Sequence, residues 1–315
     1  MGRSSAENGR PEFRYRLAFS QPLDHPNHRR LSELAERVRV ESDGRLRIEV
    51  HGAGALGSDT EMLRMVQSGE LEMYLGGNVF GALVPTAEMP GLPFTFKNSA
   101  AVFAALDGAL GDMIGAEMRA KGLHAFRYWL EHGFHHLTTR TKPIRTADDL
   151  GAMKIRTPVQ RMTVDFFATL GAEPLQFTLS RLYEVLQNHT VDGQTDPLSI
   201  VVVLKLYEVQ TYLSLTNHWW SGFTLVAHAP AWQALPGDLQ ALVEKHAKTV
   251  ALAQRRDMDR LNASALAVLR DKGLIVNEAD VSGFKKPLAA FYMRWKREYG
   301  ARAWSLLEDR VGKLI

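Results

Sequence analysis

Short stretches in which apolar and polar residues alternate follow one another along the first quarter of the chain, with helix-spaced stretches between them. Residues 13–19 and 45–50 alternate in this way, which is the pattern of a strand with one buried face. Helical spacing covers about 27–42 and 58–69, and the second of these opens on "SDTE", a capping-box sequence. A further strand is expected over 71–77. This strand–helix order predicts a parallel sheet with covering helices.

A second round of elements follows in the middle of the chain. It opens after a predicted helix over 98–121, which Gly122 ends. The same reading predicts strands over 124–130, 153–157 and 172–177, helices over about 158–170, from Ser180 and from near Pro197, and two strands within 211–228.

One long helix is predicted over 236–273, between Pro236 and Gly273. About 36 helical residues at ~1.5 Å each give roughly 54 Å, which exceeds the diameter of one domain of ordinary size. We therefore expect this helix to lie across two domains as a shared strut. The alternative is two helices with a break near Arg255 and Arg256.

Length and composition limit the class of protein. A chain of 315 residues predicts two domains, and 45% hydrophobic with 23% charged residues is an ordinary globular composition. The 38 basic and 35 acidic residues leave a net charge of only +3, without a basic stripe, so nucleic acid is not an expected partner. The chain has no cysteine, which excludes disulfides, thiol catalysis and thiolate metal sites.

The start of the chain and its apolar runs provide evidence on where the protein is located. The longest aliphatic run, "LSIVVVL" at 198–204, is too short to span a bilayer, so we expect no stable membrane insertion. The polar start of the chain predicts a disordered tail over 1–12 and shows no signal peptide. A leader removed from this sequence and a cytoplasmic protein are both compatible with that start.

Arg156 is the first candidate for a binding site. It ends the strand of "GAMKIRTPVQ" at 151–160, where Thr157 is a good N-cap and Pro158 suits a first helical turn. Ligands of open α/β sheets bind at the carboxyl ends of strands, and a helix N-terminus beside a guanidinium favours an anion. The alternative is that Arg156 pairs with a neighbouring Asp or Glu.

An enzyme is the rival class. The segment "EHGFHH" offers Glu131, His132, His135 and His136, but its spacing matches no zinc motif. On a regular strand His132 and His136 would face one side and His135 the other, which is poor geometry for a metal. No G-x-S-x-G, P-loop or dinucleotide motif follows a strand. We therefore expect no catalytic site, no metal and no cofactor.

The segments "KIRTP" and "LGAEPLQFTLSRLYEVLQNHTVDGQTDPLS" resemble the substrate-binding proteins of TRAP (tripartite ATP-independent periplasmic) transporters, of the DctP type. The segments "SDGRLRIEVHGAGALGSDTEMLRMVQSGELEM", "MPGLPFTF" and "KPIRTADDLGAMKIRTP" agree in order and spacing, so the resemblance covers about 15–305. It implies a periplasmic protein with two α/β lobes, mixed sheets and a helix spanning both lobes. It also implies closure over a small organic acid that is delivered to membrane permease subunits. We expect lobe I at 13–126 plus about 217–255 and lobe II at 127–216 plus about 256–315. A ligand sensor of the same fold, acting with a receptor, is the alternative.

The resemblance also implies site residues. Arg156 occupies the place of the arginine that clamps the ligand carboxylate in the family. Asp196 stands in "VDGQTDP" where the family carries an asparagine, and it either contacts the ligand or caps the helix that follows. His135 or His136 occupies the place of a second arginine in many relatives. The loss of that guanidinium argues against a dicarboxylate or a strongly anionic sugar acid and favours a monocarboxylate.

Further residues are weaker candidates for the pocket. His218 and Trp219 lie in the crossing back between the lobes, and Trp129 begins a segment that lines the cleft in many relatives. If two tryptophans face the pocket, a flat or aromatic acid is favoured. The remaining candidates are Gln21, Asn78 and Phe177.

Overall fold

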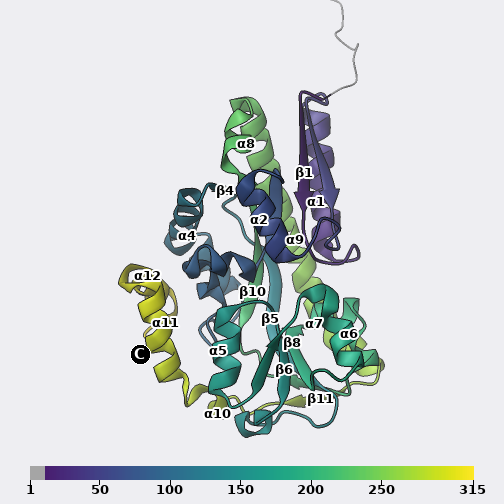
Figure 1. Ribbon diagram of the computed structural model, residues 1–315, viewed down its shortest axis with the longest axis vertical. Helices are drawn as coiled ribbons and strands as arrows, with labels where there is room; N and C mark the ends of the chain where they lie inside the picture. The colour runs from purple at the N-terminus through teal and green to yellow at the C-terminus, as the bar shows by residue number, and fades with distance from the viewer. Residues whose placement is uncertain (1–10) are drawn as a thin grey trace, which may run out of the picture.

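A computed structural model describes residues 11–315 of the chain (Figure 1). The tail expected over 1–12 lies outside the described residues except for Pro11 and Glu12, which directly precede the first strand. Figure 1 shows two groups of α/β elements, one above the other, joined by long strands and by one long helix.

The first group, which we call lobe I, has the predicted order of strands and helices. It comprises β1 (Phe13–Ala18), α1 (Pro26–Glu41), β2 (Leu46–His51), α2 (Asp59–Ser68) and β3 (Met73–Gly76). β1 pairs in parallel with both β2 and β3, so the parallel βαβ prediction is confirmed. The predicted capping box is also present at the start of α2, since the Ser58 and Glu61 side chains each accept from the other's backbone N–H.

The second group, lobe II, repeats this arrangement with β8-β6-β7 as its parallel sheet. The antiparallel strands β5 and β10 lie between the two parallel sheets and give one mixed sheet in the order β2-β1-β3-β10-β5-β8-β6-β7. The elements of this region are β6 (Lys154–Thr157), α5 (Arg161–Thr169), β7 (Glu173–Gln176), α6 (Leu182–Gln187), β8 (Gly193–Pro197), α7 (Leu198–Val203), β9 (Tyr212–Leu215), β11 (Ile275–Glu278), β5 (Leu130–Thr139) and β10 (Trp220–His228).

The long helix α9 (Gly237–Asp271) is continuous over 35 residues, so the alternative of a break near Arg255 and Arg256 is wrong. Its Leu239 and Val243 belong to the core around β1 and α1, whereas Ala265 and Leu269 belong to the core around α6 and α7. One helix therefore contributes apolar side chains to both groups of elements, as a shared strut must. The lobe boundaries given above stay a prediction.

Two elements differ from the prediction. The helix expected over 98–121 is broken into α3 (Ser99–Leu106) and α4 (Ala109–Ala120), because Asp107 leaves the helix and its carboxylate pairs with Arg255 at 2.7 Å. The strand expected over 124–130 is split into β4 (Leu123–Ala125) and the start of β5, which pair with opposite ends of β10. The chain between them leaves the strand ladder.

Across the described residues, no single helix is both long and apolar enough to cross a membrane. Only α3 and α4 taken together meet that test, and they are bent by 56°. The remaining elements are α8 (Ala229–Ala234), α10 (Ser282–Lys285), α11 (Leu288–Tyr299), α12 (Ala301–Val311) and the 3₁₀ turns Asn78–Ala82, Pro85–Gly91, Ala147–Leu150, Leu179–Arg181 and Leu206–Glu208.

Candidate ligand-binding site

A cavity of about 700 Å³, counting its open mouth, lies between lobe I and lobe II. Lobe I supplies lining residues that follow β1 and β3 and that open α2, and lobe II supplies residues at the ends of β6, β7 and β8. The floor comes from the crossing strands β5 and β10. The cavity thus lies at the carboxyl ends of the parallel strands of both lobes, where open α/β sheets bind ligands.

Arg156 lies in this cavity, on β6, and only 2% of the residue is exposed. Its Nε donates to the backbone oxygen of Phe177 at 3.0 Å, and its Nη1 donates to Oδ2 of Asp196 at 2.8 Å. Within residues 11–315 the Nη2 atom has no hydrogen-bond partner. A guanidinium has five N–H groups, so three remain for a ligand.

The helix after Arg156 begins later than expected. Thr157 stays in the ladder of β6, opposite Gln176, so it cannot act as the N-cap. The helix α5 starts at Arg161 with Gln160 as its N-cap, and Gln160 provides no side-chain cap. The expectation that a helix N-terminus directly follows Arg156 is therefore wrong, and the guanidinium itself is the positive charge of this site.

Asp196 lies on β8 and also lines the cavity. The helix that follows, α7, has Pro197 at its N-cap and no side-chain cap, so Asp196 does not serve as that cap. Its carboxylate pairs with Arg156 instead. This is the alternative given above for Arg156, namely that it pairs with a neighbouring Asp or Glu. Burial raises the pKa of Asp196 to about 6 although the charge of Arg156 acts to lower it.

Asp59 is a second carboxylate at the cavity, and the sequence reading did not single it out. It is the first residue of α2, and its Oδ1 accepts a hydrogen bond of 2.7 Å from the Tyr74 hydroxyl. Burial raises the pKa of Asp59. The available signal was its place in "SDTE", which was interpreted only as the start of a helix. That start lies at the ligand-binding edge of the parallel sheet of lobe I.

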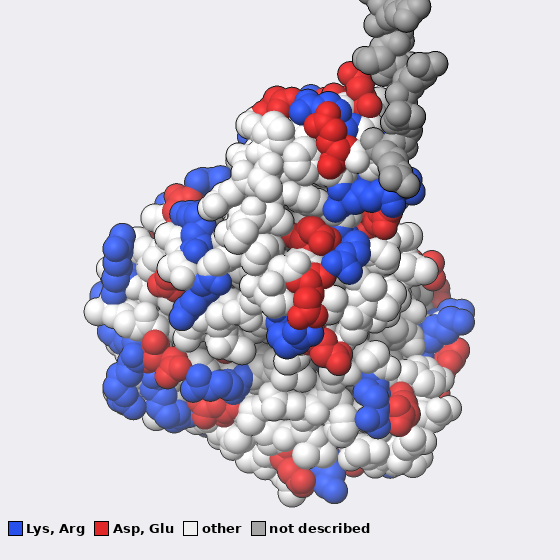
Figure 2. Space-filling model, turned by 45° about the horizontal axis from the view of Figure 1, so that its top comes forward, with Lys and Arg blue, Asp and Glu red and all other residues white. Residues whose placement is uncertain are grey.

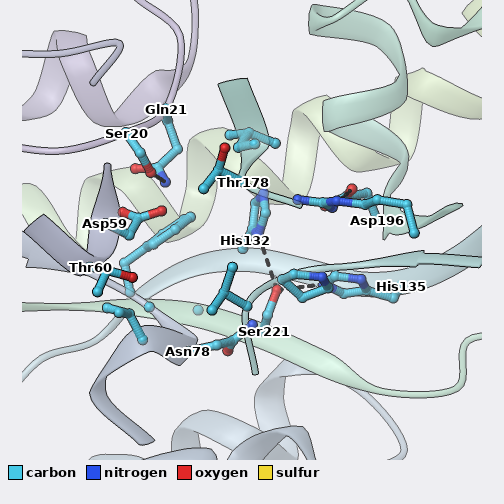
Figure 3. Close-up of a pocket in the computed structure, with 18 residues that line it drawn as sticks. Ser20, Gln21, Asp59, Thr60, Asn78, His132, His135, Thr178, Asp196 and Ser221 are labelled. Carbon is cyan, nitrogen blue, oxygen red and sulfur yellow. Dashed lines mark hydrogen bonds and ion pairs between the residues drawn. The ribbon is translucent and has the colours of Figure 1, made fainter. Parts of the chain in front are cut away.

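His132, His135 and Ser221 form the floor (Figure 3). The Ser221 hydroxyl is 3.0 Å from His132 Nδ1 and 2.8 Å from His135 Nε2. Burial holds the pKa of both imidazoles well below the usual value, so both are neutral at pH 7.

Strict strand alternation would put His132 and His135 on opposite faces, and that expectation is wrong. The pairing of β5 with β10 shifts at Ser221 and Gly222, which leaves His132 as an extra residue on β5. Gly133, directly after it, has φ 131°, a conformation that glycine adopts readily. This β-bulge brings both imidazoles to one cavity, and the sequence signals it only through the glycines.

Other predicted residues are distributed between the cavity and its surroundings. Gln21 and Asn78 line the cavity on the side of lobe I. His136 faces the opposite side of β5 from His135, where it lines a separate cavity and its Nδ1 accepts from the backbone N–H of Asn217. Burial lowers the pKa of His136 to about 4.

Three aromatic candidates and His218 do not line this cavity. Trp219 lies behind it, with its ring 3.8 Å from that of His135, and His218 is fully buried against Phe166. Trp129 lines a different cavity beside α4. Phe177 holds Arg156 through its backbone oxygen, while its side chain lies against Arg181. Neither Trp129 nor Trp219 faces the ligand space, so the condition that favoured an aromatic acid is not met.

Charges outside the cavity are mixed in sign. Figure 2 shows basic and acidic side chains interspersed over one face, with several basic side chains gathered at its lower left. Many basic side chains of the described residues form ion pairs with acidic ones. Arg294 pairs with Asp165 at 2.9 Å, and Arg161 pairs with Glu298 at 2.9 Å.

Comparison with known proteins places this architecture in a family. The model of the bacterial extracellular solute-binding proteins, family 7 (DctP), matches residues 17–298. The uncharacterized protein y4mM of Sinorhizobium fredii is 37% identical over 261 residues, which are 82% of this chain and 48% of that protein. The chain therefore spans about half the length of that relative.

Two solved structures with bound ligands share the fold. The sugar acid binding protein DctPAm from Advenella mimigardefordensis, in complex with galactonate, has a TM-score of 0.90 and 28% identity over 95% of this chain and 97% of that chain. A TRAP periplasmic solute-binding protein from Sulfurospirillum deleyianum, with bound succinate, has a TM-score of 0.89 and 25% identity over 96% of this chain and 99% of that chain. The fold is thus the two-lobed α/β fold of periplasmic binding proteins, with its long helix common to both lobes.

The family consists of proteins that bind small organic acids rather than transform them. With the family model matching residues 17–298 and a buried guanidinium between two lobes, the chain belongs to the bacterial extracellular solute-binding proteins of family 7.

Proposed function

We propose that this protein is the extracytoplasmic solute-binding component of a TRAP transporter and that it captures a small monocarboxylate. The lobes close over the acid, and the closed complex delivers it to the membrane permease subunits. The family membership and the lining of one cavity by both lobes support this proposal. The corresponding location is the periplasm or its equivalent outside the cytoplasmic membrane.

The observation that carries the proposal is the geometry of Arg156. The guanidinium is almost fully buried, and Phe177 and Asp196 fix its orientation through Nε and Nη1. Nη2, which has no partner within the described residues, and the second hydrogen of Nη1 are then available to a carboxylate, whose planar geometry matches them.

The charge balance of the cavity favours one carboxylate over two. Among the described lining residues, Arg156 is the one guanidinium, and Asp59 and Asp196 are carboxylates. His132 and His135 are neutral at pH 7 because burial lowers their pKa. A first ligand carboxylate can use the remaining N–H groups of Arg156, but a second one would be buried without a cationic partner at high cost.

Closure follows from where the lining residues lie. A ligand held by Arg156 on lobe II lies opposite Gln21, Asp59 and Asn78 on lobe I. A bridging ligand binds the closed arrangement more tightly than the open one, and this difference in affinity shifts the population toward closure.

The test is a thermal-shift panel with galactonate, lactate, succinate and the uncharged galactitol on wild type and Arg156→Ala. Binding to the native state raises the unfolding midpoint by mass action, so a monocarboxylate should stabilise wild type and not the variant. Calorimetry should show a loss of affinity of about 100-fold or more, since the ligand carboxylate would be buried without its partner.

The matched control is Arg255→Ala. Arg255 is also mostly buried and paired, with Asp107 at 2.7 Å, but it does not line the cavity. This variant should lose stability and keep the ligand response. A tenfold or smaller loss of affinity in Arg156→Ala, or an equal response to galactitol, would contradict the proposal.

A further inference from the structure

His132 has a buried polar atom without a hydrogen-bond partner among residues 11–315. Its Nε2 is buried and has no hydrogen bond to any described residue, while its Nδ1 contacts Ser221. The residue is 7% exposed and lines the cavity that holds Arg156. A buried polar atom without a partner destabilises the protein. A ligand group that enters the cavity and pairs with Nε2 removes this penalty, which favours binding.

Behind His132, a chain of hydrogen bonds leads from the cavity into the core. Ser221 Oγ joins His132 Nδ1 to His135 Nε2, and the other nitrogen of His135, Nδ1, is 3.2 Å from Thr195 Oγ1. Thr195 Oγ1 is in turn 2.9 Å from His218 Nε2, and His218 Nδ1 is 2.7 Å from Thr216 Oγ1. We call these six residues the histidine relay.

The number of hydrogens in the relay allows only two arrangements. All three imidazoles are neutral, because burial holds the pKa of each well below the usual value, so each ring carries one N–H. Each hydroxyl has one hydrogen to donate. Ser221 Oγ has no other hydrogen-bond partner within residues 11–315, so its hydrogen is paired only if it donates to one imidazole and accepts from the other. Thr195 accepts from the Trp219 indole at 3.2 Å and must also donate to one imidazole and accept from the other.

These conditions link the tautomers of the three rings. If Ser221 donates to His132, then His135 carries its hydrogen on Nε2, Thr195 donates to His135, and His218 carries its hydrogen on Nε2. If Ser221 donates to His135, every hydrogen in the relay is reversed and all three rings carry theirs on Nδ1. His132 Nε2 is thus a donor in the first arrangement and an acceptor in the second.

We propose that His132 contacts the ligand through Nε2 and that the histidine relay sets whether this atom donates or accepts. This inference rests on the proposed function. The His135 nitrogen beside Thr195 is Nδ1, and the backbone of Thr195 acts on this imidazole through an oxygen that can only accept, so the ligand-free protein favours the Nδ1–H arrangement. Arg156 and His132 line the same cavity, so a carboxylate on Arg156 that pairs with the open Nε2 atom accepts from it and favours Nε2–H at His132. Binding of an acid then reverses the relay as a unit.

Nuclear magnetic resonance on the full, uniformly ¹⁵N-labelled chain tests the linkage directly, because long-range ¹H–¹⁵N correlations distinguish the two neutral tautomers. Without ligand, His132, His135 and His218 should all show Nδ1–H. With saturating galactonate, all three should show Nε2–H. Mixed tautomers among the three rings in either state, or no change at any ring on binding, would overturn the relay.

Calorimetry with galactonate tests the contact itself. His132→Phe keeps an aromatic ring and removes both nitrogens, so affinity should fall by about 10- to 100-fold, the range for one buried hydrogen bond. His25→Phe is the matched control. His25 is equally buried and its Nε2 also has no partner in residues 11–315, but it does not line the cavity. Equal affinities of the two variants would overturn the contact.

The outcomes separate this inference from the proposed function. If galactonate binds wild type and fails to bind Arg156→Ala, while His132→Phe binds normally and the tautomers do not change, the capture of acids stands and the role of His132 is refuted. If neither galactonate nor any other acid of the panel binds wild type, both proposals fail together.

Discussion

Arg156 and Asp196 share one buried contact, and this contact decides how strongly the cavity attracts an acid. Asp196 Oδ2 occupies one N–H of Arg156 Nη1, and a ligand carboxylate has to use the others. Two carboxylates around one guanidinium repel each other, so Asp196 both orients the arginine and weakens its attraction for the ligand. The asparagine that the resemblance implies for the family at this position would orient the arginine without a charge.

Asp196→Asn should therefore bind a monocarboxylate more tightly. The amide oxygen can still accept from Arg156 Nη1, but the repulsion from Asp196 disappears and the ligand replaces this aspartate as the ionic partner of the guanidinium. We expect a gain in affinity of about tenfold, measured by calorimetry with galactonate at pH 7.5. The ligand-free variant should be less stable than wild type, because Arg156 loses its ionic partner. An unchanged or lower affinity would show that Asp196 supports the binding of the acid.

At the scale of single elements, the crossing strand β5 holds most of the unusual chemistry. Besides His132 and His135 it carries Glu131, which is buried and accepts a hydrogen bond of 2.5 Å from the Trp220 indole of β10. Burial raises the pKa of Glu131 to about 7, although the hydrogen bonds from Ser99 and Trp220 and the charge of Arg255 act to lower it.

Glu131 should make the stability of the protein depend on pH. The carboxyl pKa is raised in the folded state, so the folded protein holds a proton there that the unfolded chain has lost. The contribution of this group is fully present below about pH 4.5, and it is lost as the pH rises through about 7. Glu131→Gln removes the ionisation and keeps an oxygen for Trp220. Relative to wild type, the free energy of unfolding of the variant should rise by about 2.5 kcal/mol between pH 5 and pH 8 in urea unfolding.

The control for this pH dependence is Glu184→Gln. Glu184 is half exposed and pairs with Arg181 on the surface. Surface pairs of this kind contribute little, so the difference from wild type should be nearly the same at both pH values. If the free energy of unfolding of Glu131→Gln also differs from that of wild type by the same amount at pH 5 and pH 8, the buried carboxyl does not titrate in this range.

The regular elements could be predicted from local pattern, and the bulge could not. The capping box at Ser58 and the continuous helix α9 were expected because their signals lie within a few turns of chain. The shift of pairing at Ser221 and Gly222 depends on how two distant strands fit together, and alternation placed His132 on the wrong face for that reason. Arg156 was identified because it ends a strand and matches a family motif, whereas Asp59 carried only the signal of a helix start.

At the scale of the whole molecule, capture requires that two lobes on a common helix move relative to each other. The cavity is lined from both lobes, and the connections between them are the crossing strands and α9. The resemblance implied this architecture from motifs spread over nearly the whole chain. Pattern alone predicted the parallel sheet of lobe I, a second round of strands and helices, and the strut, but not the antiparallel pair β5 and β10 that joins the lobes.

The absence of cysteine makes lobe closure measurable without background labelling. Thr60 on α2 and Ser180, which follows β7, are both exposed and lie on opposite lobes beside the cavity. A Thr60→Cys, Ser180→Cys variant carrying a fluorescent donor and acceptor should show higher energy transfer when galactonate binds, since closure brings the lobes together. The same labels on an Arg156→Ala background should show no change at that ligand concentration, because closure is driven only by the affinity difference that the guanidinium provides. Equal energy transfer with and without a bound acid would mean that the lobes hold one separation, and the ligand would then have to enter a cavity that is already closed.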